Sequence, residues 1–595
     1  MTVILGLKVI DLIVIVGYFA VVMVIGFWAS AKVQTDEDFF LGGRRFGKGL
    51  LVMHWLCTGT HSDMAVQVAG ASARVGLGGI WYQWMWLFST PFYWLIAPMI
   101  RRLRLITTGD LFRVRYGRGL ELVYSLVALA YLILSIALLL RGAGSAIAGA
   151  TGGVIPTQHS VIVLAILFSS YIMAGGLMAA AYTDFLQGVM IIVLSFLLVP
   201  VGLDAIGGMA ALHEKLGPAM LAVTAPPGTK EGNVWFVLSM SLLGLSGIVA
   251  QPHVMTSTGS GKTEMEARVG MTYGNFIKRL LTIAWTFTGL IAAVLFADQL
   301  NGLEPGSKAA HQVSETLFGQ AIQSLLGDGW RGLMIACIVA GVTSAETIMV
   351  VGAGVMTRNF YMHLAGETDA RHLLWAGRVC SAVMLAAGIV AAVTATSVTQ
   401  LLTASVQVIG LMGPAIWLGV TWRRANPSGA WASLIAGLSV WGATSLPAAW
   451  FKWLPALEGF LVSGSQISKP AQILLMLVAQ FGALIVVSLL TKPQPASLLD
   501  PFFARLLTPV GTESENSCTT EPVEHAEQAT LGLHGKSLDY SRVSKFASPT
   551  WRRLGFEIPR FTLVDWGGFI AAWGMVVGLI GLLVWLAGLG RPSGA

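Results

Sequence analysis

Long apolar segments separated by short polar ones dominate this chain of 595 residues. A membrane-spanning helix needs about 20 predominantly apolar residues, and about fourteen segments meet that requirement. They cover residues 8–30, 47–73, 76–100, 119–147, 157–175, 182–204, 233–257, 275–298, 331–357, 373–395, 398–420, 427–447, 470–491 and 563–590. The pattern therefore predicts an all-α polytopic membrane protein.

Two of these segments are interrupted by polar residues, glycine or proline. The second contains Thr58-Gly-Thr-His-Ser-Asp-Met64, and the seventh contains Ser246-Gly247 and then Gln251-Pro-His253. Pro252 removes a backbone donor and favours a break. Unwound backbone at membrane depth is tolerated only where it lines a cavity or is buried in protein. The interruptions therefore predict a site at the two breaks.

The spacing of the two interruptions predicts an internal repeat. They lie five spans apart, so each opens a five-span unit, and an odd number of spans gives the two units opposite orientations. This arrangement is typical of inverted-repeat secondary transporters. The alternative is a helical bundle with two polar kinks and no role in transport.

The same pattern divides the chain into segments. We expect a leading transmembrane helix in residues 1–30, repeats in 47–204 and 233–420, two additional transmembrane helices in 427–491, a polar cytoplasmic loop in 492–561, and a final helix in 563–590. Lys and Arg concentrate in the loops after the first, third, seventh, ninth and eleventh spans, which the positive-inside rule places in the cytoplasm. We expect the protein to lie in the cell (inner) membrane. An even number of spans then places both termini on the outer side of that membrane.

Composition agrees with a membrane location. Only 11% of the residues are charged, whereas soluble domains carry about 25%. The net charge of +7 is spread over loops and forms no basic patch, so we expect a lipid bilayer and a small-molecule solute as partners, and no nucleic acid. The four cysteines form no metal or redox pair. With no ATP-binding signature or catalytic set, an enzyme or a primary pump is not expected.

Asp184 and Arg141 are charged residues inside apolar segments. Asp184 stands near the start of the sixth span, where an ionised group costs about 2.5–3.5 kcal/mol, so it indicates an ion or solute pathway. Its alternative is a position at the interface, capping its helix. Arg141 stands late in the fourth span. It either snorkels to the outer interface or lies beside a substrate chamber and binds a carboxylate bidentately.

Several motifs resemble the sodium/solute symporter family. They are Phe39-Phe-Leu-Gly-Gly-Arg-Arg-Phe-Gly, Ser62-Asp-Met, Gly175-Gly with Tyr182-Thr-Asp-Phe-Leu-Gln187, Gln251-Pro-His and Thr343-Ser344. The resemblance covers about residues 8–491 and is strongest to the sodium/proline and sodium/glucose branches. It implies the LeuT-type fold, a 5+5 inverted repeat with extra N- and C-terminal helices.

The resemblance also implies a main sodium site between the first and eighth core helices. It places the backbone carbonyls of His61, Met64 and Ala340 and the hydroxyls of Thr343 and Ser344 around the ion. Sodium is a hard cation that suits neutral oxygens, and unwound backbone supplies them. The two hydroxyls alternatively bond to carbonyls of their own helix.

A second ion site is implied by the same resemblance. It would use Asp184, Thr343, Glu346 and Thr347, and Asp63 matches a sodium-linked carboxylate of the proline branch. Glu346 stands where the family usually has a small hydroxyl residue. Because two carboxylates around one site cannot both stay charged cheaply, either a second sodium ion lies between them or Glu346 is protonated. The alternative is that Glu346 pairs with a cytoplasmic arginine.

Taken together, these features predict a sodium-coupled secondary active symporter that uses one or two Na⁺ ions. It is expected to import a small polar organic solute, carboxylate-bearing or sugar-like, by alternating access. The candidate substrate contacts are Thr60, Gln67, Gln83, Arg141 and Gln251. Two alternatives are a proton-coupled symporter that uses Glu346 and an uncoupled uniporter or channel.

Overall fold

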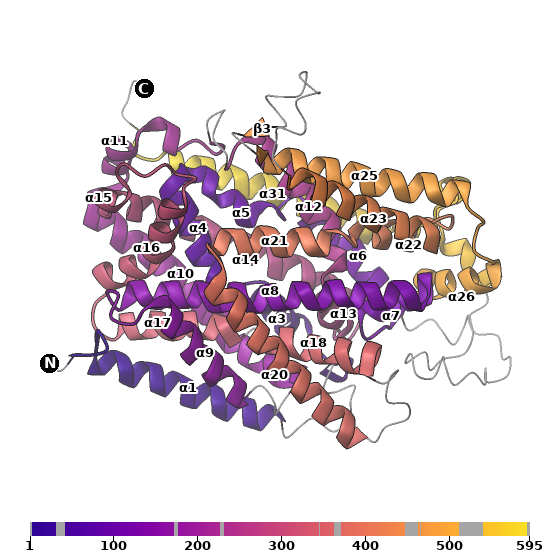
Figure 1. Cartoon of the computed structure of the whole chain (residues 1–595), viewed down its shortest axis with the longest axis horizontal. Helices are drawn as coiled ribbons and strands as arrows, with labels where there is room; N and C mark the ends of the chain where they lie inside the picture. Colours follow the sequence, from indigo (N-terminus) through magenta and orange to yellow (C-terminus); the bar gives the residue numbers. More distant parts are fainter. Residues whose placement is uncertain are drawn as a thin grey trace.

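The computed structural model describes residues 3–30, 42–171, 176–225, 231–343, 345–361, 370–446, 462–463, 466–510 and 540–591. In this part of the chain, the strands are confined to two short hairpins, β1–β2 (Val3–Ile4 and Leu7–Lys8) and β3–β4 (Val462–Ser463 and Gln466–Ile467). The rest of the regular structure is helical. Most of the long helices run along the longest axis of the molecule, side by side (Figure 1).

Every apolar segment predicted from the sequence contains helix. Through the first half of the chain these helices are α1 (Val9–Ser30), α3 (Lys48–Thr58), α4 (Ser62–Val75), η2 (Gly76–Ile80), α5 (Trp81–Trp84), α6 (Thr90–Leu103), α8 (Arg118–Ala150), α9 (Thr157–Tyr171) and α10 (Gly176–Ile206). Further along they are α12 (Val234–Gly247), η3 (Ile248–Ala250), α13 (Pro252–Gly259), α14 (Glu264–Leu295), α17 (Trp330–Thr343), α18 (Ala345–Gly354), η4 (Val355–Tyr361), α20 (Ala370–Thr394), α21 (Val398–Gly410), α22 (Gly413–Thr421), α23 (Pro427–Thr444), α25 (Lys469–Leu490) and α31 (Leu563–Gly588).

Shorter helices connect these segments. They are η1 (Gly42–Arg44), α7 (Thr108–Tyr116), α11 (Gly208–Met220), α15 (Ala297–Leu300), α16 (Lys308–Leu325), α26 (Ala496–Leu507), α29 (Tyr540–Val543), η7 (Ser544–Phe546) and α30 (Pro549–Arg552). Among the described residues, eight single helices are long and apolar enough to cross a membrane, or nine with one bent pair. This establishes a multi-pass membrane architecture, while the number fourteen and the 5+5 repeat stay predictions.

Both predicted breaks are present. Residues Gly59–His61 separate α3 from α4, and His61 is extended with φ −117° and ψ 164°. At the second break, Gln251 is extended with φ −64° and ψ 126°, and the helix axis bends by 58° between Ala250 and Pro252. Pro252 is the first residue of α13, a position where a missing backbone donor costs nothing.

Two of the differences between the structure and the predicted segments have a local explanation or consequence. The segment 398–420 is divided at Leu411 and Met412 into α21 and α22. Helix α14 begins eleven residues before the predicted segment, because the Thr263 side chain accepts a hydrogen bond from the Met265 backbone N–H and caps the helix. The added turns carry charged residues, so hydropathy alone did not reveal them.

Small residues bring the central helices into close contact. A Cβ atom added to Gly142 of α8 would lie 2.3 Å from the Asp63 Cα atom, and one added to Gly289 of α14 would lie 2.3 Å from the Ala69 carbonyl oxygen. Both contacts seat α4, the second half of the first broken helix, between α8 and α14. Small residues at helix crossings are typical of membrane bundles.

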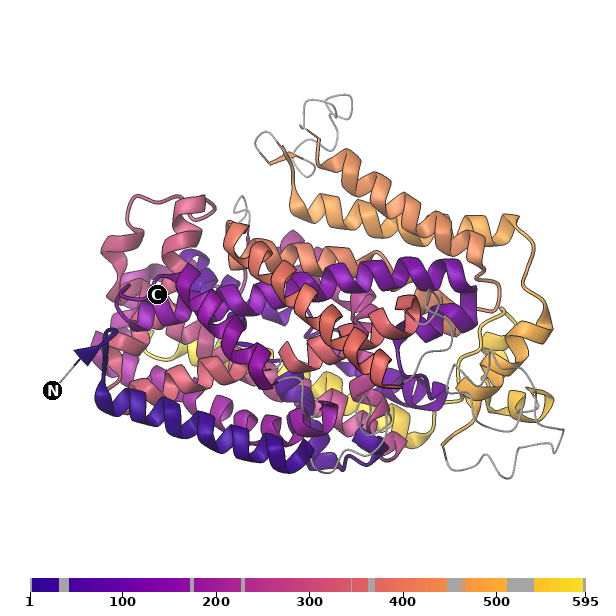
Figure 2. The same ribbon diagram turned by 60° about the horizontal axis from the view of Figure 1, so that its bottom comes forward.

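Other helices and the two ends of the described chain lie around these central helices. Helices α23 and α25 pack on each other at one edge of the bundle (Figure 2). The first and last described residues lie at the same end of the bundle (Figure 1), where Gly6 approaches Thr151 and Gly590 approaches Ala210. The placement of both termini outside stays a prediction.

Candidate functional site

The first break exposes opposite ends of two half helices to each other. A helix begins with N–H groups and ends in carbonyls that lack intrahelical partners. The helix dipole adds a partial positive charge at the N–H end and a partial negative charge at the carbonyl end. At the end of α3, the Thr58 carbonyl accepts a hydrogen bond from the His61 ring Nε2 (2.8 Å) and the Cys57 carbonyl accepts from the Thr60 backbone N–H (3.0 Å). The break therefore offers carbonyls on its α3 side and N–H groups on its α4 side.

A cavity of about 40 Å³ lies against this break. Its walls are Thr60, His61, Ser62 and Ala65 at the break, Ile191 and Ser195 of α10, Met334, Cys337, Ile338 and Gly341 of α17, and the rings of Trp285 and Phe318. The Thr60 hydroxyl is buried without a hydrogen-bond partner among the described residues. The volume suits one or a few water molecules or a small ion.

Helix α17 approaches the break through Gly341. A Cβ atom on this residue would lie 2.8 Å from the Ser62 backbone nitrogen. The neighbouring Ala340, a residue of the predicted main sodium site, is fully buried. Thus the structure brings the first break and α17 to one cavity, as that site requires.

The remaining residues of the predicted main site have different positions. The His61 carbonyl accepts a hydrogen bond from the Met64 N–H (3.1 Å). Met64 itself lies in the first turn of α4 rather than in the unwound segment, and carbonyls there accept intrahelical bonds. Ser344 and the side chain of Thr343 lie outside the described part of the chain.

Asp63 is fully buried beside the break, on the first turn of α4. Neither carboxylate oxygen has a hydrogen-bond partner among the described residues; His61 Nδ1 lies 3.8 Å from Oδ1. The carboxylate interacts electrostatically with Lys278, a buried residue of α14. The Lys278 ammonium lies 5.4 Å from the centre of the Trp86 ring, a cation–π arrangement.

Lys278 was not among the residues selected from the sequence. The signal was available, because Lys278 and Arg279 stand within the predicted span 275–298, and charged residues in a span usually mark a functional interior. In the structure both are buried, and Arg279 donates a hydrogen bond to the Gln83 backbone carbonyl (3.0 Å).

Gln67 and Gln83, two predicted substrate contacts, meet each other. Gln83 Nε2 donates a hydrogen bond to Gln67 Oε1 (2.8 Å), and both side chains are buried. Gln67 Nε2 and Gln83 Oε1 lack partners among the described residues. Since Gln67 is four residues after Asp63, the two lie on the same face of α4. The pair therefore adds a free donor and a free acceptor to the polar face that starts at the break.

Asp184 is buried and hydrogen-bonded within the protein. Its Oδ2 atom lies 2.8 Å from His54 Nδ1, and His54 Nε2 lies 3.2 Å from the Ser257 hydroxyl. The Cys57 thiol donates a hydrogen bond to the Asp184 backbone carbonyl (3.1 Å). The predicted partners of Asp184 in a second ion site, Glu346 and Thr347, have side chains outside the described part of the chain.

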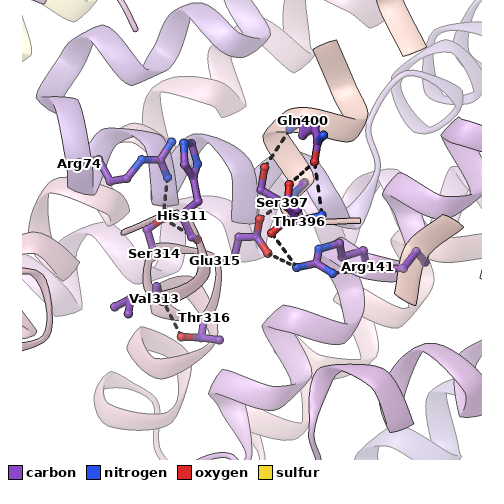
Figure 3. Close-up of polar contacts among 12 residues, drawn as sticks. Arg74, Arg141, His311, Val313, Ser314, Glu315, Thr316, Thr396, Ser397 and Gln400 are labelled. Carbon is purple, nitrogen blue, oxygen red and sulfur yellow. Dashed lines mark hydrogen bonds and ion pairs between the residues drawn. The ribbon is translucent and has the colours of Figure 1, made fainter. Parts of the chain in front are cut away.

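Protein groups bind the guanidinium of Arg141, which lies in the half of α8 farther from α7. Its guanidinium lies 3.4 Å from Glu315 Oε2 of α16 and donates hydrogen bonds to the carbonyls of Ala392 and Thr396 (Figure 3). An arginine whose donors meet a carboxylate and two carbonyls has less capacity to bind a solute carboxylate. The remaining candidate, Gln251, is buried at the second break.

A second polar cluster lies beside Arg141. Arg74, in the last turn of α4, is 3.0 Å from Glu231, and His311 of α16 is 3.1 Å from the same carboxylate. Arg74 also donates a hydrogen bond to the Ser314 hydroxyl (Figure 3). Glu231 lies in the loop before α12; burial raises the pKa of its carboxyl, but the Arg74 charge and the His311 contacts outweigh this and lower that pKa to about 2.

Comparisons with known proteins agree with this geometry. Residues 39–437 match the sequence profile of the Sodium:solute symporter family. Among curated relatives, the sodium/myo-inositol cotransporter 2 of Sus scrofa is 26% identical over 469 residues (72% of this chain, 68% of the relative), and the sodium/glucose cotransporter 1 of Oryctolagus cuniculus is 23% identical over 469 residues (72% and 71%). A Na⁺-coupled sialic acid symporter in an outward-open state has a similar fold, with a TM-score of 0.65 and 18% identity, covering 82% of this chain and 99% of that one.

Proposed function

Because this chain belongs to the sodium:solute symporter family, we propose that it imports a small polar organic solute, driven by Na⁺ entering with it. The observation that carries the proposal is the cavity between the first break and α17. The Thr60 hydroxyl and the unwound backbone of Thr60 and His61 line this cavity and offer neutral oxygens, which suit Na⁺. The buried Asp63 carboxylate adds a negative field without occupying the cavity wall.

The polar face beyond the break supports a solute rich in hydroxyl or carboxylate oxygens. Gln67 and Gln83 have an amide donor and an acceptor to spare, the Lys278 ammonium is buried nearby on α14, and the first turn of α4 directs N–H groups toward the break. A sugar, a polyol or a sugar acid offers the complementary groups. The relatives' names, which specify myo-inositol, glucose and sialic acid, fit this class.

Alternating access requires the contacts at both ends of the bundle to open in turn. At the end near α16, Arg141 pairs with Glu315 and Arg74 pairs with Glu231. On the α3 side of the first break, hydrogen bonds among the side chains of His54, Asp184 and Ser257 join α3, α10 and α13. Both sets of contacts are formed in the described part of the chain, so each must break for its end to open.

Purified protein in liposomes tests the proposal. Myo-inositol, glucose and sialic acid are supplied as radiolabelled solutes with an inward Na⁺ gradient, and accumulation above the equilibrium level is expected for at least one of them. Collapse of the Na⁺ gradient with an ionophore should abolish the accumulation. Accumulation that follows a proton gradient without Na⁺ would instead favour the proton-coupled alternative with Glu346 as the carrier, and equilibration without any gradient dependence would favour a uniporter.

A paired substitution localises the solute. Gln67→Ala removes the amide with the free donor, whereas Gln480→Ala removes a buried glutamine of α25 that bonds the Leu411 carbonyl away from the break. Loss of one hydrogen bond to a solute is expected to raise its KM about tenfold for Gln67→Ala. An unchanged KM for Gln67→Ala in a folded, Na⁺-coupled protein would remove the amide pair from the solute site.

A further inference from the structure

The buried carboxylate of Asp184 poses a question that the sodium cavity does not answer. Asp184 precedes Ile191, a cavity residue of α10, by seven residues, and His54 precedes His61 of the break by seven residues. At 1.5 Å per residue, Asp184 is about 10 Å from Ile191 along α10, and His54 lies one turn before the end of α3. The His54–Asp184 pair is therefore a second polar centre, separate from the cavity.

A buried carboxylate needs a cation or several hydrogen-bond donors, because its desolvation is otherwise too costly. At Asp184 the protein supplies the donor itself: His54 Nδ1 lies 2.8 Å from Oδ2. Oδ2 is thus the oxygen that the imidazole satisfies.

The His54 ring has little freedom to move aside. Its side chain is fully buried, its Nε2 atom contacts the Ser257 hydroxyl at 3.2 Å, and its ring lies edge-on to the Phe46 ring with centroids 6.0 Å apart. In either protonation state that places hydrogen on Nδ1, the ring donates to the carboxylate. The Nδ1–H group occupies one lone pair of Oδ2 and directs its positive end toward this oxygen, so an ion at Oδ2 would meet electrostatic repulsion from it.

We propose that His54 takes the place of a second sodium ion beside Asp184, so that each chain binds one Na⁺ ion, at the first break. This inference rests on the proposed function and gives its ion stoichiometry. It also assigns a fixed role to the pair: His54 holds α3 to α10 and α13 through side chains of the protein, where a mobile ion would do so only while bound.

Counting bound sodium tests the proposal without any solute. Purified full-length protein is equilibrated with ²²Na⁺ at constant ionic strength and pH, and the amount bound at saturation is divided by the protein concentration. One ion per chain with a Hill coefficient of one is expected. Two ions per chain would overturn the inference and leave the sodium coupling intact, whereas no bound sodium would overturn both.

Variants of His54 sharpen the count. His54→Ala removes the N–H donor and leaves room beside the carboxylate, so the count should rise to two ions per chain. His54→Gln retains an amide donor and should stay at one, as should His253→Ala, which removes a buried histidine that contacts the Trp55 ring rather than a carboxylate. A His54→Ala protein that elutes as a single folded species and still binds one ion would contradict the claim that the ring excludes an ion.

Asp184→Asn provides an independent readout. If Asp184 binds no sodium, its substitution leaves one ion per chain and changes the sodium Kd by less than about tenfold. Loss of sodium binding in a folded Asp184→Asn protein would show that the carboxylate is a sodium ligand and would overturn the inference. Should the His54 variants fail to fold, the wild-type count and the Asp184→Asn Kd still decide the matter.

Discussion

At the first break, between α3 and α4, the Thr60 hydroxyl and both Asp63 carboxylate oxygens are buried without hydrogen-bond partners in the part of the chain that the structure describes. At the second break, between η3 and α13, the Ala250 carbonyl accepts a hydrogen bond from the Tyr124 hydroxyl of α8 (2.8 Å). Both breaks unwind a helix at depth, but the first retains a carboxylate as well as a hydroxyl for a transported ion or solute, whereas the second retains the Ser246 hydroxyl among the described residues. The comparison indicates a chemical role for the first break and a mechanical role for the second.

Removal of the Asp63 charge should produce the largest difference between the two breaks. By Coulomb's law, a carboxylate and a monovalent cation about 8 Å apart attract each other by about 2 kcal/mol at an effective dielectric constant of about 20. Asp63→Asn is therefore expected to raise the sodium Kd about thirtyfold, measured by ²²Na⁺ binding.

Glu315→Gln is the matched control for this change, because Glu315 is also buried but pairs with Arg141 at the α16 end of the bundle. Its sodium Kd should change less than about threefold, within 1 kcal/mol. Equal effects of the two substitutions would mean that sodium affinity responds to the total buried charge and not to the first break.

Glycines at the two breaks offer a second comparison. A Cβ atom on Gly341 would lie 2.8 Å from the Ser62 backbone nitrogen, whereas one on Gly247 would lie 3.5 Å from its nearest neighbour, Gly410. Gly341→Ala should push α17 away from the first break and weaken sodium binding about tenfold, a loss of about 1.4 kcal/mol. Gly247→Ala is expected to leave sodium affinity unchanged, since its new methyl group makes only ordinary van der Waals contact.

The reverse order, with Gly247→Ala the more damaging change, would place the ion at the second break. The free energy of unfolding should be compared in parallel, because a methyl group that clashes with backbone also destabilises the bundle.

Features that depend on local chemistry were predictable from the sequence. Pro252 cannot donate a backbone hydrogen bond, and the run from Thr58 to Met64 lacks the apolar side chains of a span, so both breaks are visible without tertiary contacts. The sequence predicted that Gln67 and Gln83 lie near the solute, but it did not predict the hydrogen bond between them.

Features that depend on contacts between distant segments were not predictable. His54 and Asp184 are 130 residues apart in sequence, and no spacing rule connects them. Considered without its partner, Asp184 was compatible with an ion ligand. A carboxylate in an apolar segment needs a partner, but its position in the sequence does not show whether that partner is an ion or a side chain. For the same reason Arg141 was open to two interpretations until Glu315 of α16 was placed against it.

A milder test concerns the second break alone. Tyr124→Phe removes the donor to the Ala250 carbonyl and should lower the free energy of unfolding by about 1–3 kcal/mol, the cost of an unsatisfied buried acceptor. Sodium affinity should not change, because the first break keeps all of its groups. A weaker sodium Kd for Tyr124→Phe would show that the second break contributes to the ion site as well as to the rigidity of the bundle.

The far end of α4 tests how much the first broken helix depends on its anchor outside the site. Because Arg74 and His311 lower the pKa of Glu231 from 4.5 to about 2, protonation of this carboxyl is easier in the unfolded chain than in the folded one. Its contribution to stability is complete above about pH 4.5 and declines as the pH falls toward 2. Thermal unfolding of detergent-solubilised protein should therefore show a fall in Tm over this pH range that is smaller in Glu231→Gln. The sodium Kd at neutral pH should change least of all in this variant, because the anchor lies at the opposite end of α4 from the cavity. A change in Kd as large as that of Asp63→Asn would mean that α4 transmits strain along its length, and the first break could then no longer be treated as a self-contained ion site.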